Sequence, residues 1–223
     1  MDNYYQEHLS AQRLELVYEL APPRVKRYLL AEISFVLERI KSTDIVLELG
    51  CGYGRVLEQV INKGDFSIGV DTSFDSLRAS STRLKGIANG AVARMNAIDL
   101  GLKDACFDHV ICIQNGISAF HVEPVQLIKE SIRVTKSGGS IIFSSYSDKF
   151  WDNRLAWFRI QAEHGLVGEI DWQATGDGRI VCKDGFRAIA FGANDFESLV
   201  SCLGLRYEIQ EVDESSIFCE IFA

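Results

Sequence analysis

Apolar residues along the chain gather in short runs that are separated by segments of helical periodicity. Ile45–Leu49, for example, is apolar except for Glu48, and it is too short for a helix. Runs of this kind are typical of strands that are covered on both faces. The predicted strands of this part of the chain cover residues 45–49, 66–70, 91–95, 108–113 and 140–145.

The segments between these runs carry apolar residues at steps of three and four. The first helix follows Pro22-Pro23, since proline is tolerated in a first turn, and extends to about Lys41. The other predicted helices cover residues 56–62, 75–85, 122–134 and 193–203. Strands that alternate with helices imply right-handed crossovers and a parallel sheet. The pattern therefore predicts a doubly wound α/β fold.

The regular pattern stops between Tyr146 and Phe191 and resumes with two closing strands, 206–212 and 216–222. Two short runs, 167–174 and 179–182, flank a turn sequence, Thr175-Gly176-Asp177-Gly178, that is typical of a β-hairpin. At 223 residues the chain is expected to form a single domain, 1–223. Within it, we expect residues 1–41 to form an N-terminal helical lid and residues 147–191 to form an inserted cap with a small β-hairpin.

Three glycines, Gly50, Gly52 and Gly54, stand at the turn from the first strand into its helix. In doubly wound sheets, ligands bind beyond the carboxyl ends of the strands, and glycine allows a ligand to approach the main chain. Nicotinamide-binding loops read G-x-G-x-x-G, whereas this loop reads G-x-G-x-G with Arg55 in the place of the last glycine. The tighter loop suits a ligand without a pyrophosphate.

Two acidic residues accompany this loop. Asp71 ends the second strand, seventeen positions after Gly54, where its carboxylate can accept hydrogen bonds from both hydroxyls of a ribose. Glu48 precedes the loop directly; a carboxylate there would repel a phosphate and favour a cation. The loop therefore indicates an adenosine that carries a positive charge.

The segment Glu48-Leu49-Gly50-Cys51-Gly52-Tyr53-Gly54 resembles the E/D-x-G-x-G-x-G signature of class I S-adenosylmethionine (SAM)-dependent methyltransferases. "FDHVICI", "RVTKSGGSIIFS" and "AFGANDFESLVSCLGL" resemble three later family segments, in the family's order, so the likeness covers Val25 to the C-terminus. The resemblance implies a Rossmann-like, mostly parallel seven-stranded sheet with an antiparallel last strand. It also implies SAM as cofactor, with S-adenosylhomocysteine (SAH) as product, and methyl transfer to a small-molecule acceptor.

By this resemblance, the cofactor-binding residues are expected to come from the strand ends and from the lid. Asn96 stands where the family usually has an adenine-facing aspartate, although Asp99 is the alternative if the register differs. Arg24 and Tyr28 share a helix face and are expected to reach the donor's carboxylate, the alternative being a surface arginine and a core tyrosine. The expected set is Arg24, Tyr28, Glu48, Gly50, Cys51, Gly52, Gly54, Asp71, Thr72, Asn96, Ala97, Ile98 and Gln114.

Methyl transfer requires positioning of donor and acceptor, and it requires a base only if the acceptor's lone pair carries a proton. Candidate acceptor-side residues are His121 as a base and Tyr146 after the fifth strand. The alternative for His121 is a turn residue before a helix. The aromatic residues of the insertion, Trp151, Trp157, Phe158 and Trp172, are candidates for a pocket wall or for simple packing.

Charge and cysteine usage narrow the choice of partners. The formal net charge of −8 disfavours nucleic acid, and Gln114-Asn115-Gly116-Ile117 lacks the N/D-P-P-Y/F tetrad of base-methylating family members. No apolar run is long enough for a membrane span, and the six scattered cysteines indicate neither a metal site nor disulfides but a reducing cytoplasm. We expect a monomer or homodimer. The alternative functions are a non-catalytic SAM- or SAH-binding protein and, disfavoured by the loop spacing, an NAD-dependent oxidoreductase.

Overall fold

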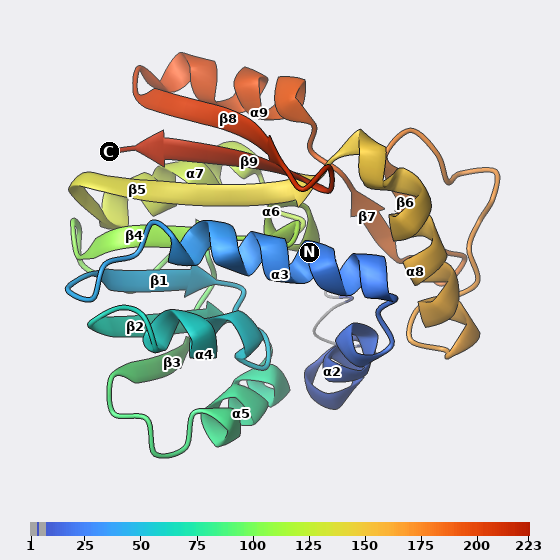
Figure 1. Ribbon diagram of the computed structural model, residues 1–223, viewed down its shortest axis with the longest axis horizontal. Coiled ribbons are helices and arrows are strands. Elements are labelled where there is room, and N and C mark those ends of the chain that lie inside the picture. Colours follow the sequence, from blue (N-terminus) through green and yellow to red (C-terminus); the bar gives the residue numbers. More distant parts are fainter. Residues whose placement is uncertain (1–3, 5–7) are drawn as a thin grey trace.

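One seven-stranded sheet forms the centre of the computed structural model, which describes residue 4 and residues 8–223 (Figure 1). The strand order is β3-β2-β1-β4-β5-β9-β8. Neighbouring strands from β3 to β5 are parallel, whereas β9 is antiparallel to both β5 and β8. The predicted doubly wound sheet with an antiparallel last strand is confirmed. Its strands are β1 Ile45–Leu49, β2 Phe66–Asp71, β3 Gly90–Arg94, β4 Phe107–Cys112, β5 Thr135–Tyr146, β8 Arg206–Val212 and β9 Ser216–Phe222.

Helices cover both faces of the sheet. On one face α3, α4 and α5 pack against it, for example through Val36, Val60 and Leu77. On the other face α7 and α9 bury Leu127 and Phe196. Burial on both faces explains why β1, apart from Glu48, and the second half of β4, residues 110–112, are apolar. The helices are α2 Ala11–Glu19, α3 Pro23–Leu37, α4 Arg55–Ile61, α5 Phe74–Arg83, α6 Gly116–Ala119, α7 Pro124–Val134, α8 Trp151–Glu163 and α9 Ala193–Val200, with short 3-10 turns η1 Asp148–Phe150 and η2 Ser201–Leu203.

The insertion is more regular than the sequence pattern indicates, because it begins with the helix α8. This helix buries Arg154 and Gln161 together with Trp157 and Phe158. Since polar side chains are among its buried residues, the alternation of apolar and polar positions does not reveal a helix. The prediction of an irregular segment here is corrected.

The hairpin of the insertion also pairs differently from the prediction. Its strands are β6 Arg179–Val181 and β7 Arg187–Ile189, which are antiparallel, whereas the run 167–174 contributes only an isolated bridge, Ile170 to Cys182. Asp184-Gly185 is a second D-G turn signal, and it stands between the two strands that pair. The β5 strand likewise begins at Thr135 instead of Ser140, with a register shift against β4.

The N-terminal segment and the insertion pack against each other beyond the carboxyl ends of the parallel strands, at the right of Figure 1. The indole N–H of Trp157 in α8 donates to the carbonyl oxygen of Val17 in α2 at 3.0 Å, and both side chains belong to one buried cluster. A wall built from two segments about 140 residues apart in sequence thus closes this edge of the sheet. Within the part of the chain that the structure describes, no helix combines the length and apolar character needed to cross a membrane.

Candidate functional site

A cavity of about 600 Å³ lies at the carboxyl edge of the parallel strands. Its floor comes from the ends of β1, β2, β3 and β4 and from the loops that follow them. Its outer wall comes from α2 and α8. In the N-terminal segment the lining residues are Leu9, Leu14, Val17 and Tyr18, so α3 contributes none of the lining. A volume of this size suits a small organic ligand.

The glycine loop between β1 and α4 has the backbone conformation that its composition predicts. Gly50, Gly52 and Gly54 all have positive φ, of 72°, 52° and 86°. A Cβ atom on Gly50 would lie 2.5 Å from the Phe120 ring, whereas one on Gly52 would meet only the tip of Leu14, at 3.1 Å. Gly52 lines the cavity together with Gly50 and Cys51. The main chain of this loop is therefore open to a ligand.

An acidic and a basic side chain face the cavity beside this loop. Glu48 is the penultimate residue of β1 and is 5% exposed. Arg55 begins α4, with its guanidinium carbon 4.5 Å from the centre of the Tyr18 ring. Within the described residues, Glu48 Oε2 and Arg55 Nη2 are both buried and have no hydrogen-bond partner. Burial raises the pKa of Glu48 to about 8, with Arg55 lowering it and Asp71 raising it further. Buried, unpaired polar atoms of this kind indicate a site built for a ligand.

We expect Glu48→Gln to stabilise the ligand-free protein at about pH 8 and to have little effect near pH 4. Between its ordinary pKa and about 8, Glu48 keeps its proton in the folded state and loses it in the unfolded state. Its contribution to folding therefore falls as pH rises through this range, by at most about 1.4 kcal/mol per pH unit. Urea denaturation at several pH values, with Glu38→Gln on the surface as control, measures the effect. A difference between wild type and Glu48→Gln that does not change with pH would contradict it.

Asp71, at the end of β2, is held toward the glycine loop. Its two carboxylate oxygens accept hydrogen bonds from the backbone N–H groups of Gly52, at 2.9 Å, and Ser73, at 2.8 Å. Burial raises its pKa, and these N–H groups act in the opposite direction. Each carboxylate oxygen retains a second lone pair, which a ligand hydroxyl can use. Asp71 and the exposed Thr72 both line the cavity.

The loop after β3 presents Asn96 and Ala97 to the cavity. Asn96 Oδ1 accepts from the N–H of Ile98 at 3.2 Å, and Ile98 packs against the core instead of lining the cavity. Asp99 is exposed and is likewise absent from the lining. Of the two alternatives for the adenine-facing position, the geometry favours Asn96, and Ile98 is moved from the cofactor contacts to the core.

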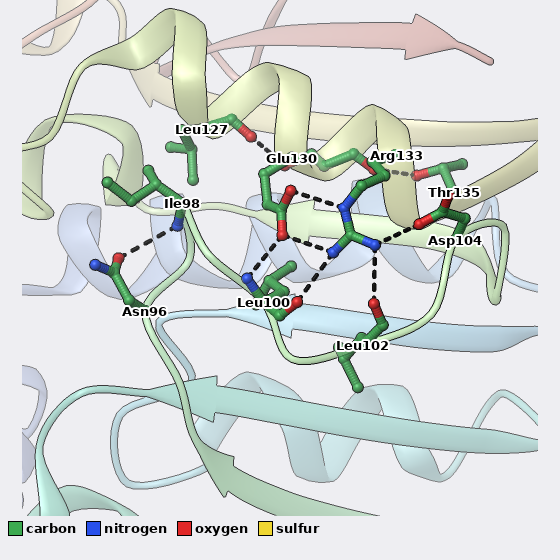
Figure 2. Close-up of polar contacts among 10 residues, drawn as sticks. Asn96, Ile98, Leu100, Leu102, Asp104, Leu127, Glu130, Arg133 and Thr135 are labelled. Atoms are coloured by element: carbon green, nitrogen blue, oxygen red, sulfur yellow. Dashed lines mark hydrogen bonds and ion pairs between the residues drawn. The ribbon is translucent and has the colours of Figure 1, made fainter.

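Arg133 of α7 holds this loop in place (Figure 2). Its guanidinium donates to the carbonyl oxygens of Leu100, at 3.0 Å, and Leu102, at 2.8 Å. It also forms ion pairs with Glu130 and Asp104, both at 2.6 Å. Glu130 in turn accepts from the N–H of Leu100 at 2.7 Å. The loop that carries Asn96 is thus anchored to a helix through charge-assisted hydrogen bonds.

Gln114 follows β4 in a left-handed conformation, φ 58°, which non-glycine residues seldom adopt. Its N–H donates to Glu32 Oε2 and to Ser144 Oγ, both at 2.8 Å. Glu32 lies on α3, is fully buried, and has a pKa raised to about 7 by burial. Gln114 lines the cavity, and its Nε2 atom is buried without a partner among the described residues. The buried Glu32 carboxylate therefore stabilises the left-handed backbone at Gln114, whose side chain lines the cavity.

The structure places Arg24 and Tyr28 away from the cavity. Arg24 pairs with Asp213 in the β8–β9 turn, at 2.8 Å, and donates to its carbonyl oxygen at 2.7 Å. Tyr28 is fully buried between Tyr146 and Phe150. The alternative readings, a surface arginine and a core tyrosine, describe both residues, and we withdraw them as cofactor contacts. Their contact residues, Asp213 for Arg24 and Tyr146 and Phe150 for Tyr28, are far from α3 in sequence.

The two acceptor-side candidates differ in position. Tyr146, at the end of β5, lines the cavity, and burial raises its pKa to about 12. The guanidinium carbon of Arg154 lies 4.2 Å from the centre of its ring. His121 follows α6 with φ 48° and is not part of the lining, so the geometry favours its alternative as a turn residue. His109 lies in β4, as the sequence indicates, where its ring contacts Asp44 and Ser140.

Among the cavity residues that the sequence analysis did not name as ligand contacts are Tyr18, Arg55 and Gln161. For Arg55 a signal existed, because a cation directly after the third glycine must lie at the start of the helix, beside the loop. Tyr18 and Gln161 carry no such signal, since helices far from the glycine loop in sequence bring them there. Of the aromatic residues in the insertion, Trp157 and Phe158 line the cavity, whereas Trp172 is 53% exposed.

Comparison with known proteins finds a family that is similar to the central part of this chain. Residues 47–143 match the family model described as a methyltransferase domain. A malonyl-[acyl-carrier protein] O-methyltransferase from Marinomonas sp. (strain MWYL1) is 32% identical over an alignment of 136 residues, which covers 55% of this chain and 48% of that protein. The chain spans about half the length of the curated relatives it matches.

Solved structures share the fold over nearly the whole chain. The PH0226 protein from Pyrococcus horikoshii OT3 is 22% identical with a TM-score of 0.67, covering 100% of this chain and 99% of that one. DhpI, in the DhpI-SAM-HEP complex, is 19% identical with a TM-score of 0.66, covering 99% of this chain and 95% of that one. The glycine loop and the sheet order agree with this match, so residues 47–143 are similar to the methyltransferase-domain family and the whole chain shares the fold of these solved structures.

Proposed function

We propose that the protein binds SAM in this cavity and transfers its methyl group to a small-molecule acceptor. The observation that carries the proposal is the pair Glu48 and Arg55, an acidic and a basic side chain whose buried Oε2 and Nη2 atoms lack partners among the described residues. A ligand with a zwitterionic amino-acid end satisfies both at once: its carboxylate suits the guanidinium and its ammonium group suits Glu48. The DhpI-SAM-HEP complex supports the proposal, since its fold is shared and its name includes SAM.

The remaining contacts follow from the strand ends. Asp71 would accept from the ribose hydroxyls, with Thr72 beside it, and Asn96 and Ala97 would border the adenine ring. The open main chain of Gly50, Cys51 and Gly52 would lie along the nucleoside, with Gly54 completing the turn into α4. Gln114 would offer its free Nε2 near the amino-acid end. These residues differ from the sequence-based set chiefly in that Arg55 replaces Arg24 and Tyr28.

The protein's share of the chemistry is positioning and exclusion of water. When bound, SAM supplies a methyl group on a positively charged sulfur, which an acceptor lone pair can displace in line. The α2–α8 wall covers the cavity and keeps water from that group, and Tyr146 offers a hydroxyl that can hold an acceptor atom. The restricted cavity supports a small acceptor. The six free thiols, Cys51, Cys106, Cys112, Cys182, Cys202 and Cys219, fit a reducing cytoplasm, which is part of the proposal.

Titration calorimetry with SAM, SAH and NAD, followed by a transfer assay with methyl-labelled SAM and a panel of small acceptors, tests the proposal. We expect SAM and SAH to bind in the micromolar range or tighter and NAD not to bind. SAH binding with no transfer to any acceptor would favour the non-catalytic alternative. Binding of NAD without any response to SAH would overturn the assignment of the cavity.

A further inference from the structure

The two sides of the cavity differ in charge. Its charged lining residues, Glu48, Arg55, Asp71 and Arg94, all come from the strand ends and the glycine loop. The opposite wall, from α2 and α8, contributes only uncharged side chains to the described lining. These are Leu14, Val17, Tyr18, Trp157, Phe158 and Gln161. A group that lies against this wall therefore finds apolar and aromatic surface and no partner for a full charge.

Gln161 is the polar exception in the α8 part of this wall. It is 1% exposed, and its Nε2 atom is buried without a hydrogen-bond partner within the part of the chain described. It lies four residues after Trp157 and three after Phe158, on the same face of α8, and all three line the cavity. A buried amide donor is costly unless something accepts from it. Because the residue borders the cavity, a ligand atom is the natural acceptor.

The aromatic side chains around Gln161 are held in fixed orientations. The Trp157 indole N–H donates to the Val17 carbonyl oxygen at 3.0 Å, which fixes the plane of that ring. Phe158 packs against Phe186 of the insertion, with ring centres 5.5 Å apart. A rigid aromatic wall favours flat ligands, because stacking on it requires little further ordering of side chains.

Tyr18 connects this wall to the charged side of the cavity. Its ring lies 6.0 Å from that of Trp157, and the Arg55 guanidinium lies over it at 4.5 Å. The wall therefore adjoins the end of the cavity that holds Glu48 and Arg55. Asn96 and Arg94 belong to the loop and strand end at β3, the side proposed for adenosine. A ligand against the wall would thus lie next to the amino-acid end of the donor.

We propose that the α2–α8 wall is the acceptor subsite, and that it takes an uncharged, planar, largely apolar molecule whose oxygen or nitrogen atom accepts a hydrogen bond from Gln161 Nε2. This inference rests on the proposed function, because it assigns the rest of the cavity to SAM. Gln161 acts here as a binding residue that orients the acceptor, and Trp157 and Phe158 supply the surface against which the flat molecule lies.

The test uses four probes on the full chain saturated with SAH: 1-naphthol, naphthalene, 1-naphthoate and 1-naphthylmethylammonium. Binding is followed by the change in tryptophan fluorescence, because Trp157 lines the subsite. We expect 1-naphthol to bind roughly tenfold tighter than naphthalene, and we expect both charged probes to bind more weakly than 1-naphthol. Tighter binding of either charged probe would overturn the inference.

Variants then assign the effect to one side chain. Gln161→Leu, or Gln161→Met if the first does not fold, should abolish the preference for 1-naphthol over naphthalene while naphthalene binds as before. Gln173→Leu makes the same change at an exposed position of the insertion and should keep the preference. A preference that survives in both Gln161 variants would overturn the inference.

The SAH titration separates this inference from the proposed function. SAH should bind the Gln161 variants as it binds wild type, because Gln161 lies on the wall away from the glycine loop. If wild type does not bind SAH at all, the proposed function fails. If SAH binds normally but 1-naphthol and naphthalene bind equally well to wild type, the assignment of the acceptor subsite fails alone.

Discussion

Gly52→Val is expected to reduce the affinity for SAH by roughly 100-fold or more, which corresponds to about 2.7 kcal/mol. Gly52 has φ 52° and lines the cavity, so a branched side chain there would occupy ligand space. Its Cβ would also press on Leu14 of α2, at 3.1 Å. Its N–H donates to Asp71, so a change in the loop's conformation would disturb the ribose contact as well. Titration calorimetry with SAH measures the loss.

The control for backbone strain is Gly86→Val. Gly86 also has positive φ, 89°, but it is exposed and nothing lies within 4 Å of a Cβ placed on it. Both variants should lose about 1–3 kcal/mol of folding stability, because a β-branched residue is strained in this conformation. Only Gly52→Val should lose SAH binding. Equal affinities for SAH in the two variants would show that the ligand does not lie against the glycine loop.

Arg55→Met is expected to weaken SAH binding by about 10- to 150-fold, the effect of a lost hydrogen bond to a charged group, about 1.5–3 kcal/mol. The substitution keeps an unbranched apolar stem that can still contact Tyr18. The guanidinium Nη2 is buried and lacks a partner within the described chain, so a ligand carboxylate is its expected partner. Calorimetry with 5′-methylthioadenosine, which lacks the amino-acid end, should show the same affinity for wild type and variant.

Arg24→Met is the matched control, since the sequence points to Arg24 and the structure to Arg55. Arg24 pairs with Asp213, and both side chains are partly exposed. Its loss should cost about 0–1 kcal/mol of stability and leave SAH binding unchanged. If Arg24→Met instead weakens SAH binding while Arg55→Met does not, then Arg24 of α3, and not Arg55, binds the carboxylate of the ligand. A loss of methylthioadenosine binding in Arg55→Met would place the guanidinium elsewhere along the ligand.

The central sheet and its ligand loop were predictable because they depend on signals that are local in sequence. A parallel strand that is buried on both faces must be largely apolar, as β1 is except for Glu48, and a short apolar run in the sequence reveals it. The turn at Gly52 needs positive φ, which only glycine adopts readily, so composition marks it. Asp71 and Asn96 follow strands whose carboxyl ends must meet at one edge. Their approximate positions therefore followed from strand order alone.

The helix α8 was missed for a physical reason. Arg154 is buried in it because it donates to the carbonyl oxygens of Gly178 and Ala188, and Gln161 is buried because it borders the cavity. Neither environment is visible in a local pattern. Arg24 was misassigned for the same reason: its helix face was predicted, but its ion partner, Asp213, lies 189 residues away. Long-range partners decide where a charged side chain goes.

The sequence by itself determined the class of fold, the glycine loop and the acids that flank it, since strand burial and backbone conformation constrain residue type at each position. Only the tertiary structure decided what closes the cavity and which cation faces it. The packing of α2 on α8 places Tyr18 and Gln161 on the same wall of the cavity. The ion pair with Asp213 holds Arg24 away from the cavity, so Arg55 takes the place that the sequence suggested for Arg24. Such contacts depend on how distant segments pack, and no local pattern of residues encodes them.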